Sequence, residues 1–385
     1  MEHSPSLSRR RFFGLSLATT AATLLPAPRA RATAAAIEVL ETKVISPQPN
    51  YYHGWPTLTR TRGGELVVVW SGRREAHVCP FGTVEMMTSR DDGSSWTFPR
   101  TVHDGPIDDR DAGVLETAKG TLIITTFTSL AYAPMVAAGG DKAKDPAWLA
   151  THTRIVDERT RIGELGCWCF RSTDRGLSFS GRIDTIVNSP HGPCQLGDGR
   201  LLYAGKELWT DEKRIGVSVS SNDGETWDWL AEIPIRKGDK VREYHELHAV
   251  QCASGKIILQ IRNHNEANKG ETLQSESTDG GKNWTVPHPI GVWGLPSHLL
   301  RLRDGRLLMS YGHRRKPFGN QARFSSDEGE SWSEPIELSG DGIGGDLGYP
   351  STVELEDGGF VSVWYERLAG SPMAQIRQAK WRITG

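Results

Sequence analysis

One short phrase recurs five times along the chain and constrains its fold more than any other feature. The shared core is Ser/Thr/Asn-Asp-x-Gly-x-Ser/Thr/Asn-Trp/Phe, and the third copy has one residue fewer between Asp and Gly. Asp accepts hydrogen bonds from nearby backbone N–H groups, Gly supplies positive φ, and the aromatic ring packs a hairpin turn against its sheet. Five copies at intervals of roughly 50–80 residues predict a repeat architecture. The copies lie at residues 89–96, 172–179, 220–227, 277–284 and 326–332.

Six strongly apolar segments, each after a glycine-containing turn, divide the chain into similar units. We expect each unit to contain an opening strand, the apolar strand, a variable middle loop, a third strand, the repeated phrase as a hairpin, and a fourth strand. A content of 42 Gly and 13 Trp in 385 residues agrees with a turn-rich all-β protein. Six four-stranded antiparallel sheets closed in a ring predict a six-bladed β-propeller. The apolar segments are residues 65–71, 121–127, 200–205, 256–262, 306–312 and 360–366.

The two ends of the chain are expected to meet in the sixth blade. Only five copies of the phrase serve six blades, which is what ring closure at the last blade would require. Residues 373–381 would form the third strand of that blade, and residues 37–45 would supply its outer strand. Such a closure leaves no open blade edge.

One middle loop is much longer than the others and predicts a helical insertion in blade two, at about residues 130–165. Asp145 and Pro146 predict a helix start, because Asp is a good N-cap and Pro is favoured at the first helical position. Helical spacing then continues from Trp148 to Arg159. The insertion is either a structural flap or a lid over a substrate site, and the sequence leaves both open.

Residues 1–32 have the features of an export signal. Arg9, Arg10 and Arg11 precede an apolar run at residues 14–25, and a small-residue cleavage site follows at residues 30–32. This pattern predicts a twin-arginine signal, and the run is too short to span a bilayer. We therefore expect an exported protein, periplasmic or secreted, whose propeller occupies residues 33–385. The net charge of −2 gives no basic field for nucleic acid, and we expect no membrane association after cleavage.

The candidate functional residues lie in segments that this topology brings to one end of the propeller. If the repeated hairpins occupy one end, the starts of the opening strands and the middle loops occupy the other, where functional side chains collect on a rigid scaffold. Alignment on the glycine turns puts Asp111, Glu246 and Tyr349 at the same position in blades two, four and six. The opening strands also carry His53, His191 and His298, and the middle loops carry Arg73, Glu75, His77, Arg262, His264 and Arg314.

A tyrosine beside a carboxylate can act as a nucleophile, because the carboxylate accepts the phenolic proton. Sialidases use such a tyrosine, and the chain resembles the sialidase, or Asp-box (BNR) repeat, superfamily across the predicted propeller. The five Asp phrases carry the resemblance, together with Glu246 sixteen residues before Arg262 and with Tyr349 in a Tyr-Pro-Ser-Thr opening. The resemblance implies Tyr349 as nucleophile, Glu246 as its base and Arg262 as one of three arginines that bind a substrate carboxylate.

The resemblance is incomplete at three places. The third arginine belongs to the preceding blade, where Arg323 is the closest match by position and Arg314 is an alternative. The Arg-Ile-Pro motif that opens the first blade of sialidases is replaced by Gly-Trp-Pro at residues 54–56, so Arg73 would have to supply the first arginine. The first middle loop lacks the acid/base Asp, which leaves Glu75 or His77 for that role.

Three functions remain open, all with a carbohydrate partner. The first is a sialidase-like exo-glycosidase that cleaves a terminal acidic sugar. This sugar is either sialic acid or the acidic unit of a uronic-acid-containing glycan. The second is a uronate-directed lyase with Arg262, a histidine and Tyr349. The third is a non-catalytic carbohydrate-binding propeller, because a fold does not determine a function. We predict neither a metal nor another cofactor, since His245 and His248 would point to opposite faces of a strand and no better ligand pair stands out.

Overall fold

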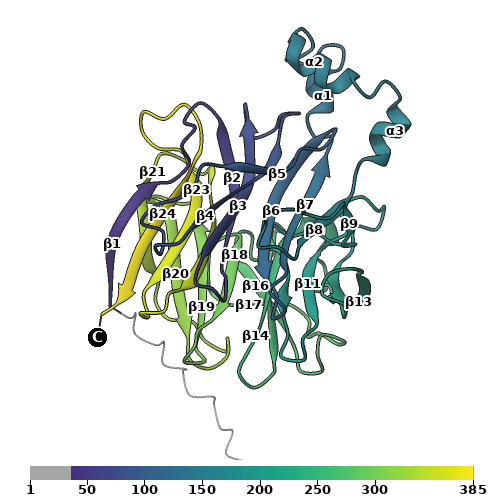
Figure 1. The fold of residues 1–385 in the computed structure, drawn as a ribbon. Coiled ribbons are helices and arrows are strands. Elements are labelled where there is room, and N and C mark those ends of the chain that lie inside the picture. Colours follow the sequence, from purple (N-terminus) through teal and green to yellow (C-terminus); the bar gives the residue numbers. More distant parts are fainter. Residues whose placement is uncertain (1–35, 385) are drawn as a thin grey trace, which may run out of the picture. The chain divides into compact units, whose positions relative to one another are not determined.

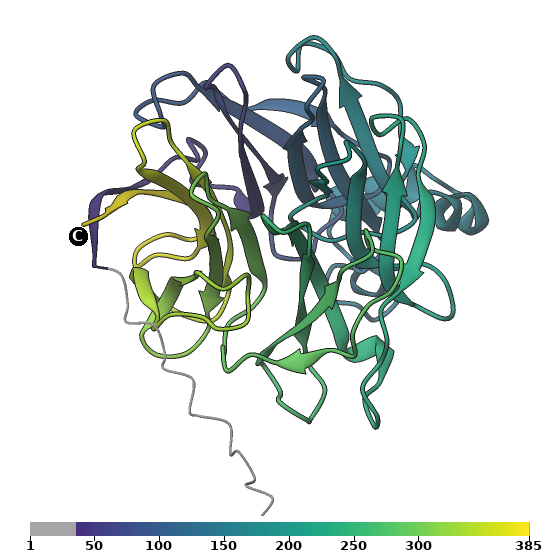
Figure 2. The same ribbon diagram turned by 90° about the horizontal axis from the view of Figure 1, so that it is seen from below.

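Six four-stranded antiparallel sheets make up the protein in a computed structural model that describes residues 36–384. The sheets are arranged around a central axis (Figure 2). The fold is the six-bladed β-propeller expected from the repeats. The predicted export signal, residues 1–32, lies outside the described residues.

Blades one to three follow one another along the chain, and their strands lie in sequence order within each sheet. Blade one contains β2 (Tyr52–Arg60), β3 (Leu66–Arg74), β4 (Thr83–Ser89) and β5 (Arg100–His103). Blade two contains β6 (Asp108–Glu116), β7 (Leu122–Ser129), β8 (Cys167–Ser172) and β9 (Ile183–Asp184). Blade three contains β10 (Cys194–Gln195), β11 (Leu201–Lys206), β12 (Ile215–Ser220) and β13 (Asp228–Glu232).

Blades four and five repeat this order, and blade six takes its fourth strand from the start of the described chain. Blade four follows a short 3-10 helix (Val241–Glu243) and contains β14 (Tyr244–Gln251), β15 (Ile257–Asn263), β16 (Thr272–Ser277) and β17 (His288–Pro289). Blade five contains β18 (Ser297–Arg301), β19 (Leu307–His313), β20 (Phe318–Ser325) and β21 (Ile336–Gly342). Blade six contains β22 (Leu347–Glu354), β23 (Phe360–Glu366), β24 (Gln375–Ile383) and β1 (Ile37–Val44).

Blade six closes the ring in the predicted way. β1 pairs antiparallel with β24 and forms the outer strand of the sheet (Figure 1). The first repeated hairpin adds a second connection, because Trp96 Nε1 donates to Gln378 Oε1 at 2.8 Å. Gln378 Nε2 in turn donates to the Gly93 carbonyl at 3.0 Å. Blade one is therefore fixed to blade six by its hairpin as well as by side-chain packing.

Each repeated phrase forms the same turn between the third and fourth strands of its blade. In the first copy, Asp91 Oδ1 accepts hydrogen bonds from Ser95 N and Ser89 Oγ, both at 2.8 Å. Ser89 Oγ also accepts from Gly93 N at 2.9 Å. The buried backbone donors of the turn are thus satisfied by its own side chains.

The third copy corrects the alignment made from the sequence. Asn222, and not Asp223, holds the Asp position, because Asn222 Oδ1 accepts from Thr226 N at 3.0 Å and from Ser220 Oγ at 2.9 Å. No residue is missing from this copy. An amide replaces the carboxylate, and a left-handed residue follows before the glycine as in the first copy, with φ of 64° at Asp223.

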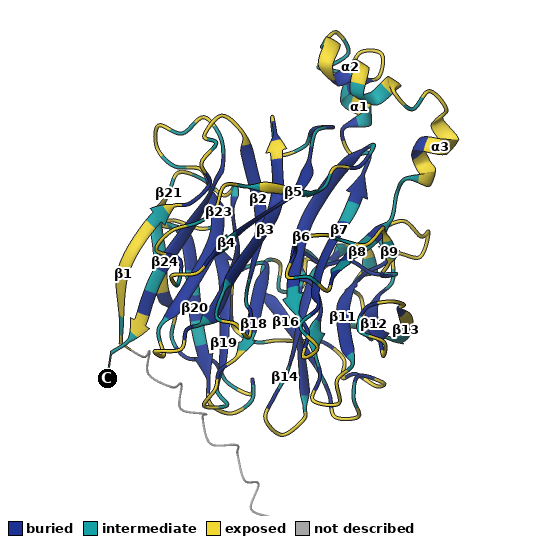
Figure 3. Ribbon diagram, in the orientation of Figure 1, coloured by how far each residue is buried: buried dark blue, intermediate teal, exposed yellow. Residues whose placement is uncertain are grey.

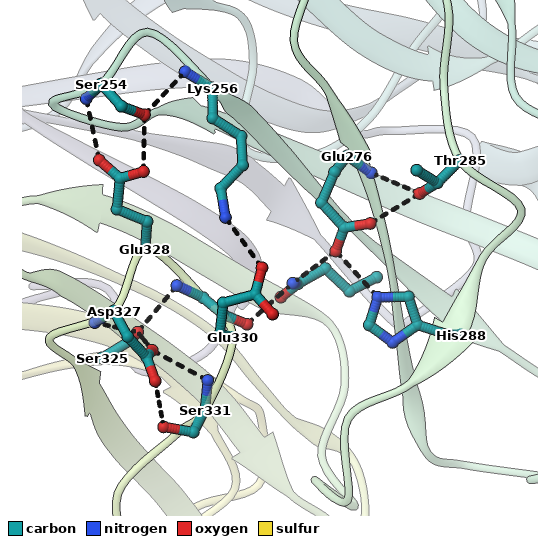
Figure 4. A network of polar contacts seen from close by, with 12 residues as sticks. Ser254, Lys256, Glu276, Thr285, His288, Ser325, Asp327, Glu328, Glu330 and Ser331 are labelled. Carbon is teal, nitrogen blue, oxygen red and sulfur yellow. Dashed lines mark hydrogen bonds and ion pairs between the residues drawn. The ribbon is translucent and has the colours of Figure 1, made fainter. Parts of the chain in front are cut away.

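The hairpins also connect neighbouring blades. In the fifth copy, Glu328 accepts two hydrogen bonds from Ser254, from the backbone N at 2.8 Å and from the hydroxyl at 2.6 Å (Figure 4). Lys256 lies 3.2 Å from Glu330 of the same hairpin. These contacts join blade five to blade four, so the hairpin end of the propeller has a structural role.

Burial follows the position of each strand in its blade. β23 is buried along its whole length, whereas most of β1 is exposed (Figure 3). Apolar side chains of adjacent blades pack between the sheets, and one such cluster joins blade one to blade six through Trp55, Trp70 and Val363. This packing holds the inner strands rigidly, so their ends can position functional side chains.

The predicted insertion in blade two consists of three short helices at one end of the propeller (Figure 1). Asp145 caps α2 (Pro146–Thr153) by accepting from Ala147 N and Trp148 N, as predicted. The helical pattern does not continue to Arg159, because Asp157 caps a separate helix, α3 (Glu158–Gly163). α1 (Ala133–Val136) precedes both. None of the helices in residues 36–384 is long and apolar enough to cross a membrane.

Candidate active site

Four inner strands carry a register irregularity near the start of the strand. In β2, β6 and β22 the irregularity coincides with a non-glycine residue of positive φ, namely Trp55 (56°), Asp111 (41°) and Tyr349 (52°). In β14 it falls at Glu246. Such backbone conformations are rare outside glycine, and bulges redirect side chains beside active sites. These irregularities bring Asp111, Glu246 and Tyr349 together from blades two, four and six.

Tyr349, Glu246 and Arg262 form a closed hydrogen-bonded triangle. The Tyr349 hydroxyl donates to Glu246 Oε1 at 2.7 Å. One terminal nitrogen of Arg262 lies 3.0 Å from Glu246 Oε1 and 3.0 Å from the Tyr349 hydroxyl. Tyr349 is buried, and the Arg262 and Glu246 side chains are 14% and 20% exposed. The triangle is therefore rigid yet open to a ligand at one end.

The surroundings of the triangle favour a neutral phenol and an ionised carboxylate. Burial raises the pKa of Tyr349 well above its usual value, and the negative charge of Glu246 raises it further. Burial is the largest single influence on Glu246 and would raise its pKa, but the positive charge of Arg262, together with His245, Arg314 and the hydrogen bond from Tyr349, lowers it. At neutral pH Tyr349 therefore keeps its proton and directs it at an ionised base.

Asp111 has different electrostatics from Glu246. Its side chain is buried, and this burial, helped by the charge of Glu246, raises its pKa to about 7 in spite of Arg110 beside it. A carboxyl group that titrates near neutrality can donate a proton in one step and accept one in the next. Two carboxyl groups of unequal pKa thus lie beside one tyrosine.

Three arginines surround these groups. Besides Arg262, the guanidinium of Arg314 lies 5.7 Å from the centre of the Tyr349 ring, and its Nε donates to the Leu347 carbonyl at 3.1 Å. The guanidinium of Arg110 lies 4.5 Å from the centre of the Trp55 ring. Sequence reasoning missed Arg110, and its only signal was its place next to Asp111. Three cations in one buried site can bind an anionic group.

His264 orients Arg262. Arg262 Nε donates to His264 Nε2 at 2.9 Å, which requires that this ring nitrogen carry no proton. Burial, together with the positive charge of Arg262, lowers the pKa of His264 to about 4, so the ring is neutral at physiological pH. The His245 ring lies beside it, with ring centres 4.6 Å apart. His264 thus holds the guanidinium in one plane.

A second polar group centres on Asp346, three residues before Tyr349, which the sequence analysis did not single out. Its carboxylate lies 3.1 Å from His77 Nδ1 and accepts hydrogen bonds from the hydroxyls of Tyr52 and Tyr365 at 2.9 and 3.1 Å. The half-exposed His77 ring meets the Trp55 ring edge-on, with centres 5.0 Å apart. A carboxylate-supported imidazole therefore lies at the same end of the propeller as the Tyr349 triangle.

Three buried histidines pack below Tyr349. The rings of His248 and His298 are stacked with centres 4.8 Å apart, and the His191 ring lies 5.2 Å from His298 and 6.3 Å from Tyr349. Burial lowers the pKa of each of the three, to about 3 for His298. The rings pack mainly on one another and against Tyr349, and the assignment of His191 and His298 to substrate binding stays a prediction. Sequence reasoning treated His248 only as a failed metal ligand, whereas it completes this packed trio.

His53 and Arg323 lie elsewhere than predicted. His53 is fully buried, with Nδ1 accepting from Trp70 Nε1 at 2.8 Å, because the bulge in β2 presents Trp55 instead. Arg323 Nε donates to the Tyr311 hydroxyl at 2.9 Å, and another nitrogen donates to the Ser333 carbonyl. It therefore belongs to the outer part of blade five, and Arg314 takes the place beside Tyr349.

Arg73 and Glu75 face the insertion and not the Tyr349 triangle. Glu75 Oε2 accepts from Trp148 Nε1 of α2 at 2.8 Å, and Arg73 Nε lies 3.3 Å from Glu85. Both line a cavity of about 340 Å³ together with Arg154 of the insertion. The helices are thus attached to blade one through Glu75, one of the two residues predicted as the acid/base. Within residues 36–384, no cluster of three His, Cys, Asp or Glu side chains is arranged to hold a metal ion.

The sequence matches the BNR repeat-like domain over residues 142–363, which is more than half of the chain. The chain belongs to the BNR repeat-like family. This agrees with the resemblance that the five Asp phrases carry. No curated protein matches this BNR repeat-like chain.

Solved structures share the fold of this BNR repeat-like propeller at low sequence identity. A protein of unknown function from Dyadobacter fermentans is similar with a TM-score of 0.74 and 23% identity, over 90% of this chain and 99% of that one. The intramolecular trans-sialidase from Ruminococcus gnavus gives 0.64 and 13%, over 91% and 97%. An α-L-arabinanase from Penicillium chrysogenum gives 0.59 and 12%, over 89% and 98%. At these identities the likeness shows the fold, so the chemistry has to be argued from the residues of the site.

Proposed function

We propose that the protein is a retaining exo-glycosidase of sialidase type that removes a terminal acidic sugar from a glycan. The observation that carries the proposal is the triangle of Tyr349, Glu246 and Arg262, with hydrogen bonds of 2.7 and 3.0 Å. A buried tyrosine whose proton is directed at an ionised carboxylate is a nucleophile with its base. The sugar belongs either to the sialic acids or to the uronic acids.

The reaction would proceed in two steps. Tyr349 Oη attacks the anomeric carbon while Glu246 takes the phenolic proton, and Asp111 protonates the leaving oxygen as the glycosidic bond breaks. A water molecule then attacks the same carbon, Asp111 accepts its proton, and the phenolate recovers its proton from Glu246. The pKa of about 7 for Asp111 suits both of its roles. This assignment moves the acid/base role from Glu75 or His77 to Asp111.

The arginines would bind the substrate carboxylate. Arg262 of blade four and Arg314 of blade five both contact Tyr349, so a carboxylate attached at the anomeric carbon or beside it falls within their reach. Arg110 is the third cation, next to Trp55 of the Gly-Trp-Pro segment that replaces the Arg-Ile-Pro motif of sialidases. Because the first blade lacks the arginine of sialidases, uronic-acid glycosides should be tested before sialosides.

The decisive experiment compares wild type with Tyr349→Phe on sialosides and uronic-acid glycosides, with product analysis. We expect the wild type to release the free acidic sugar with retained anomeric configuration, and Tyr349→Phe to lose at least about 10³-fold in kcat. Undiminished turnover by the variant removes Tyr349 as nucleophile. Glycan that binds but stays intact with the wild type identifies a carbohydrate-binding propeller instead.

A second candidate function is a uronate lyase, and the pair of His77 and Asp346 favours it. A half-exposed imidazole held by a carboxylate at 3.1 Å is a suitable base for a C5 proton, with Arg262 neutralising the adjacent carboxylate. Elimination would leave an unsaturated product that absorbs in the ultraviolet. Appearance of this absorbance, and its loss in His77→Gln, would replace the hydrolase proposal by the lyase.

We also propose that the protein is exported by the twin-arginine route. The proposal rests on the arginines and the apolar run of residues 1–32. Replacement of Arg9, Arg10 and Arg11 by lysines would retain the protein in the cytoplasm, as fractionation of cells would detect. Unchanged export would contradict it.

A further inference from the structure

Two tryptophans stand out because they are exposed. The chain has 13 tryptophans, and the structure describes all of them, yet only Trp209 and Trp293 are exposed, at 43% and 39%. Trp209 lies in the middle loop of blade three, after β11, and Trp293 lies directly before β18 of blade five. Both segments belong to the end of the propeller that carries the Tyr349 triangle. Tryptophan is enriched at binding surfaces, so an exposed tryptophan at this end is a candidate contact for a ligand.

The surroundings of the two rings differ. Trp293 is covered by a cation, because the Arg315 guanidinium lies 4.7 Å from its ring centre. Trp209 rests against Phe127, with ring centres 6.3 Å apart. Phe127 pairs across the sheet with Arg110, the neighbour of Asp111. Trp209 is thus connected to Asp111 through Phe127 and Arg110.

A groove begins two residues after Trp209 in the same loop, at Asp211. It has a volume of about 560 Å³ and runs between the loops of blades three and four, with Lys213 and Lys240 among its lining residues. Acidic and basic side chains both line it, so it carries no strong charge of one sign. The others are Asp211, Glu212, Val241 and Arg242.

The chemistry of this surface fits sugar units. Charged tips can hydrogen-bond the hydroxyl groups of a pyranose, and aliphatic stems together with an indole ring can pack on its C–H face. The floor of the groove is held rigidly, because Lys206 donates to the carbonyls of Arg242 and Tyr244, both at 2.9 Å. A mixture of both charges selects for neutral hydroxyls over a polyanion.

We propose that Trp209 and the adjoining groove form a leaving-group subsite, so that the substrate is an oligosaccharide of at least three units with its acidic sugar at the end that is cleaved. The cleaved sugar occupies the Tyr349 triangle, the next unit stacks on Trp209, and the following unit enters the groove. This inference rests on the proposed function, since Asp111 must be the acid that defines the leaving-group side.

The test compares a small leaving group with a long one. Product analysis first identifies the acidic sugar. Its methyl glycoside is then compared with a trisaccharide that ends in the same sugar. The trisaccharide is 3′-sialyllactose for sialic acid and a glucuronic-acid-terminated trisaccharide for uronic acid. We expect Trp209→Ala to lower kcat/KM about 10–30-fold for the trisaccharide and less than about twofold for the methyl glycoside. Trp209→Leu, which keeps an apolar contact with Phe127, should show the same selective loss and guards against a folding defect.

The matched control is Trp293→Ala, the other exposed tryptophan. It should leave the ratio of the two kcat/KM values within about twofold of wild type. Equal losses on both substrates with Trp209→Ala, or an equal effect of Trp293→Ala, would overturn the subsite. Absence of turnover on both probes by the wild type would instead defeat the proposed hydrolase, and the two failures are therefore distinguishable.

Discussion

The two ends of the propeller use repetition in opposite ways. At the hairpin end, the same backbone position carries the same chemistry in successive blades, as Asp91 and Asp327 show with matching hydrogen bonds to Ser95 and Ser331. At the other end, the irregular position in the inner strand of four blades carries a different side chain each time, including Asp111 and Tyr349. Uniform repeats thus mark structural positions, and a repeat position with varied residues marks the site.

The largest expected effect tests the site end. Arg262→Lys keeps the positive charge beside Glu246 but removes the planar donors that reach Tyr349 and His264. We expect a loss of about 10²–10³-fold in kcat/KM, or about 3–4 kcal/mol of transition-state stabilisation, with little change in melting temperature. Arg315→Lys, at an exposed neighbouring position, is the control. A loss below about fivefold in Arg262→Lys would mean that the triangle does not bind the reacting part of the substrate.

The next effect tests the hairpin end. Trp96→Ala removes the ring that packs against the blade-one core and its hydrogen bond to Gln378. We expect the free energy of unfolding to fall by about 3 kcal/mol in urea titrations, with unchanged activity per folded molecule. Phe98→Ala, at 69% exposure on the same hairpin, should change it by less than about 0.5 kcal/mol. Lost activity at unchanged stability would contradict the division between the two ends.

Asp111 supplies a pH test of the site end. Its raised pKa of about 7 means that the acid form is present below pH 7 and is lost as the pH rises, so kcat/KM should decline on the alkaline side. Asp111→Asn should lower kcat/KM at pH 6 by about 10²-fold, or about 2.7 kcal/mol, and abolish that decline. An alkaline limb that persists in Asp111→Asn would assign the acid to another group, with Glu75→Gln and His77→Gln as the comparisons.

The buried histidines predict a pH dependence of stability. His298 has its pKa lowered to about 3 by burial, so between that value and about 6.5 the unfolded chain binds a proton that the folded chain does not. Stability should therefore fall as the pH is lowered, and His298→Gln should remove about 2 kcal/mol of the loss between pH 7 and pH 5. His288 is the contrasting control, because its hydrogen bond to Glu276 raises its pKa and gives a contribution of opposite sign. An unchanged pH slope in His298→Gln would show that His298 binds its proton equally in the folded and unfolded states.

The smallest effect concerns the third hairpin, where Asn222 replaces Asp. Asn222→Asp restores a charged acceptor for Thr226 N and should raise the free energy of unfolding by about 0.5 kcal/mol, whereas Asn222→Ala should lower it by about 1 kcal/mol. Thermal melts of the three proteins would rank them. Equal stability of all three would show that the phrase acts through its backbone and glycine alone.

The sequence was a good guide wherever a local pattern determines the structure. Hairpin chemistry and glycine turns predicted six blades, and the alignment on those turns placed Asp111, Glu246 and Tyr349 at equivalent positions. The assignments that went wrong depend on bulges, which change the direction of a side chain by one residue. His53 and Trp55 are both buried, but only Trp55 packs beside Tyr349, and no pattern along β2 reveals which of them does so.

Side-chain contacts beyond a single strand were equally hard to predict. Arg323 matched the expected position in the chain, but its side chain is held by Tyr311 and Ser333 within its own blade. Asp346 reaches His77 across 269 positions in the chain, a pairing that only ring closure creates. The stacking of His248 on His298 likewise joins two blades. Such contacts are set by the curvature of the whole ring, which no single segment encodes.

The pairing of β1 with β24 affects how the protein folds during its synthesis. About 330 residues separate the two strands, so at translation rates of about 5–20 residues per second β1 waits roughly 15–65 s for its partner. Until then blade six cannot be completed. The ring therefore closes only after nearly the whole chain has been synthesised. A shortened chain without β1 would expose the edge of β24, and such an edge invites pairing with another molecule.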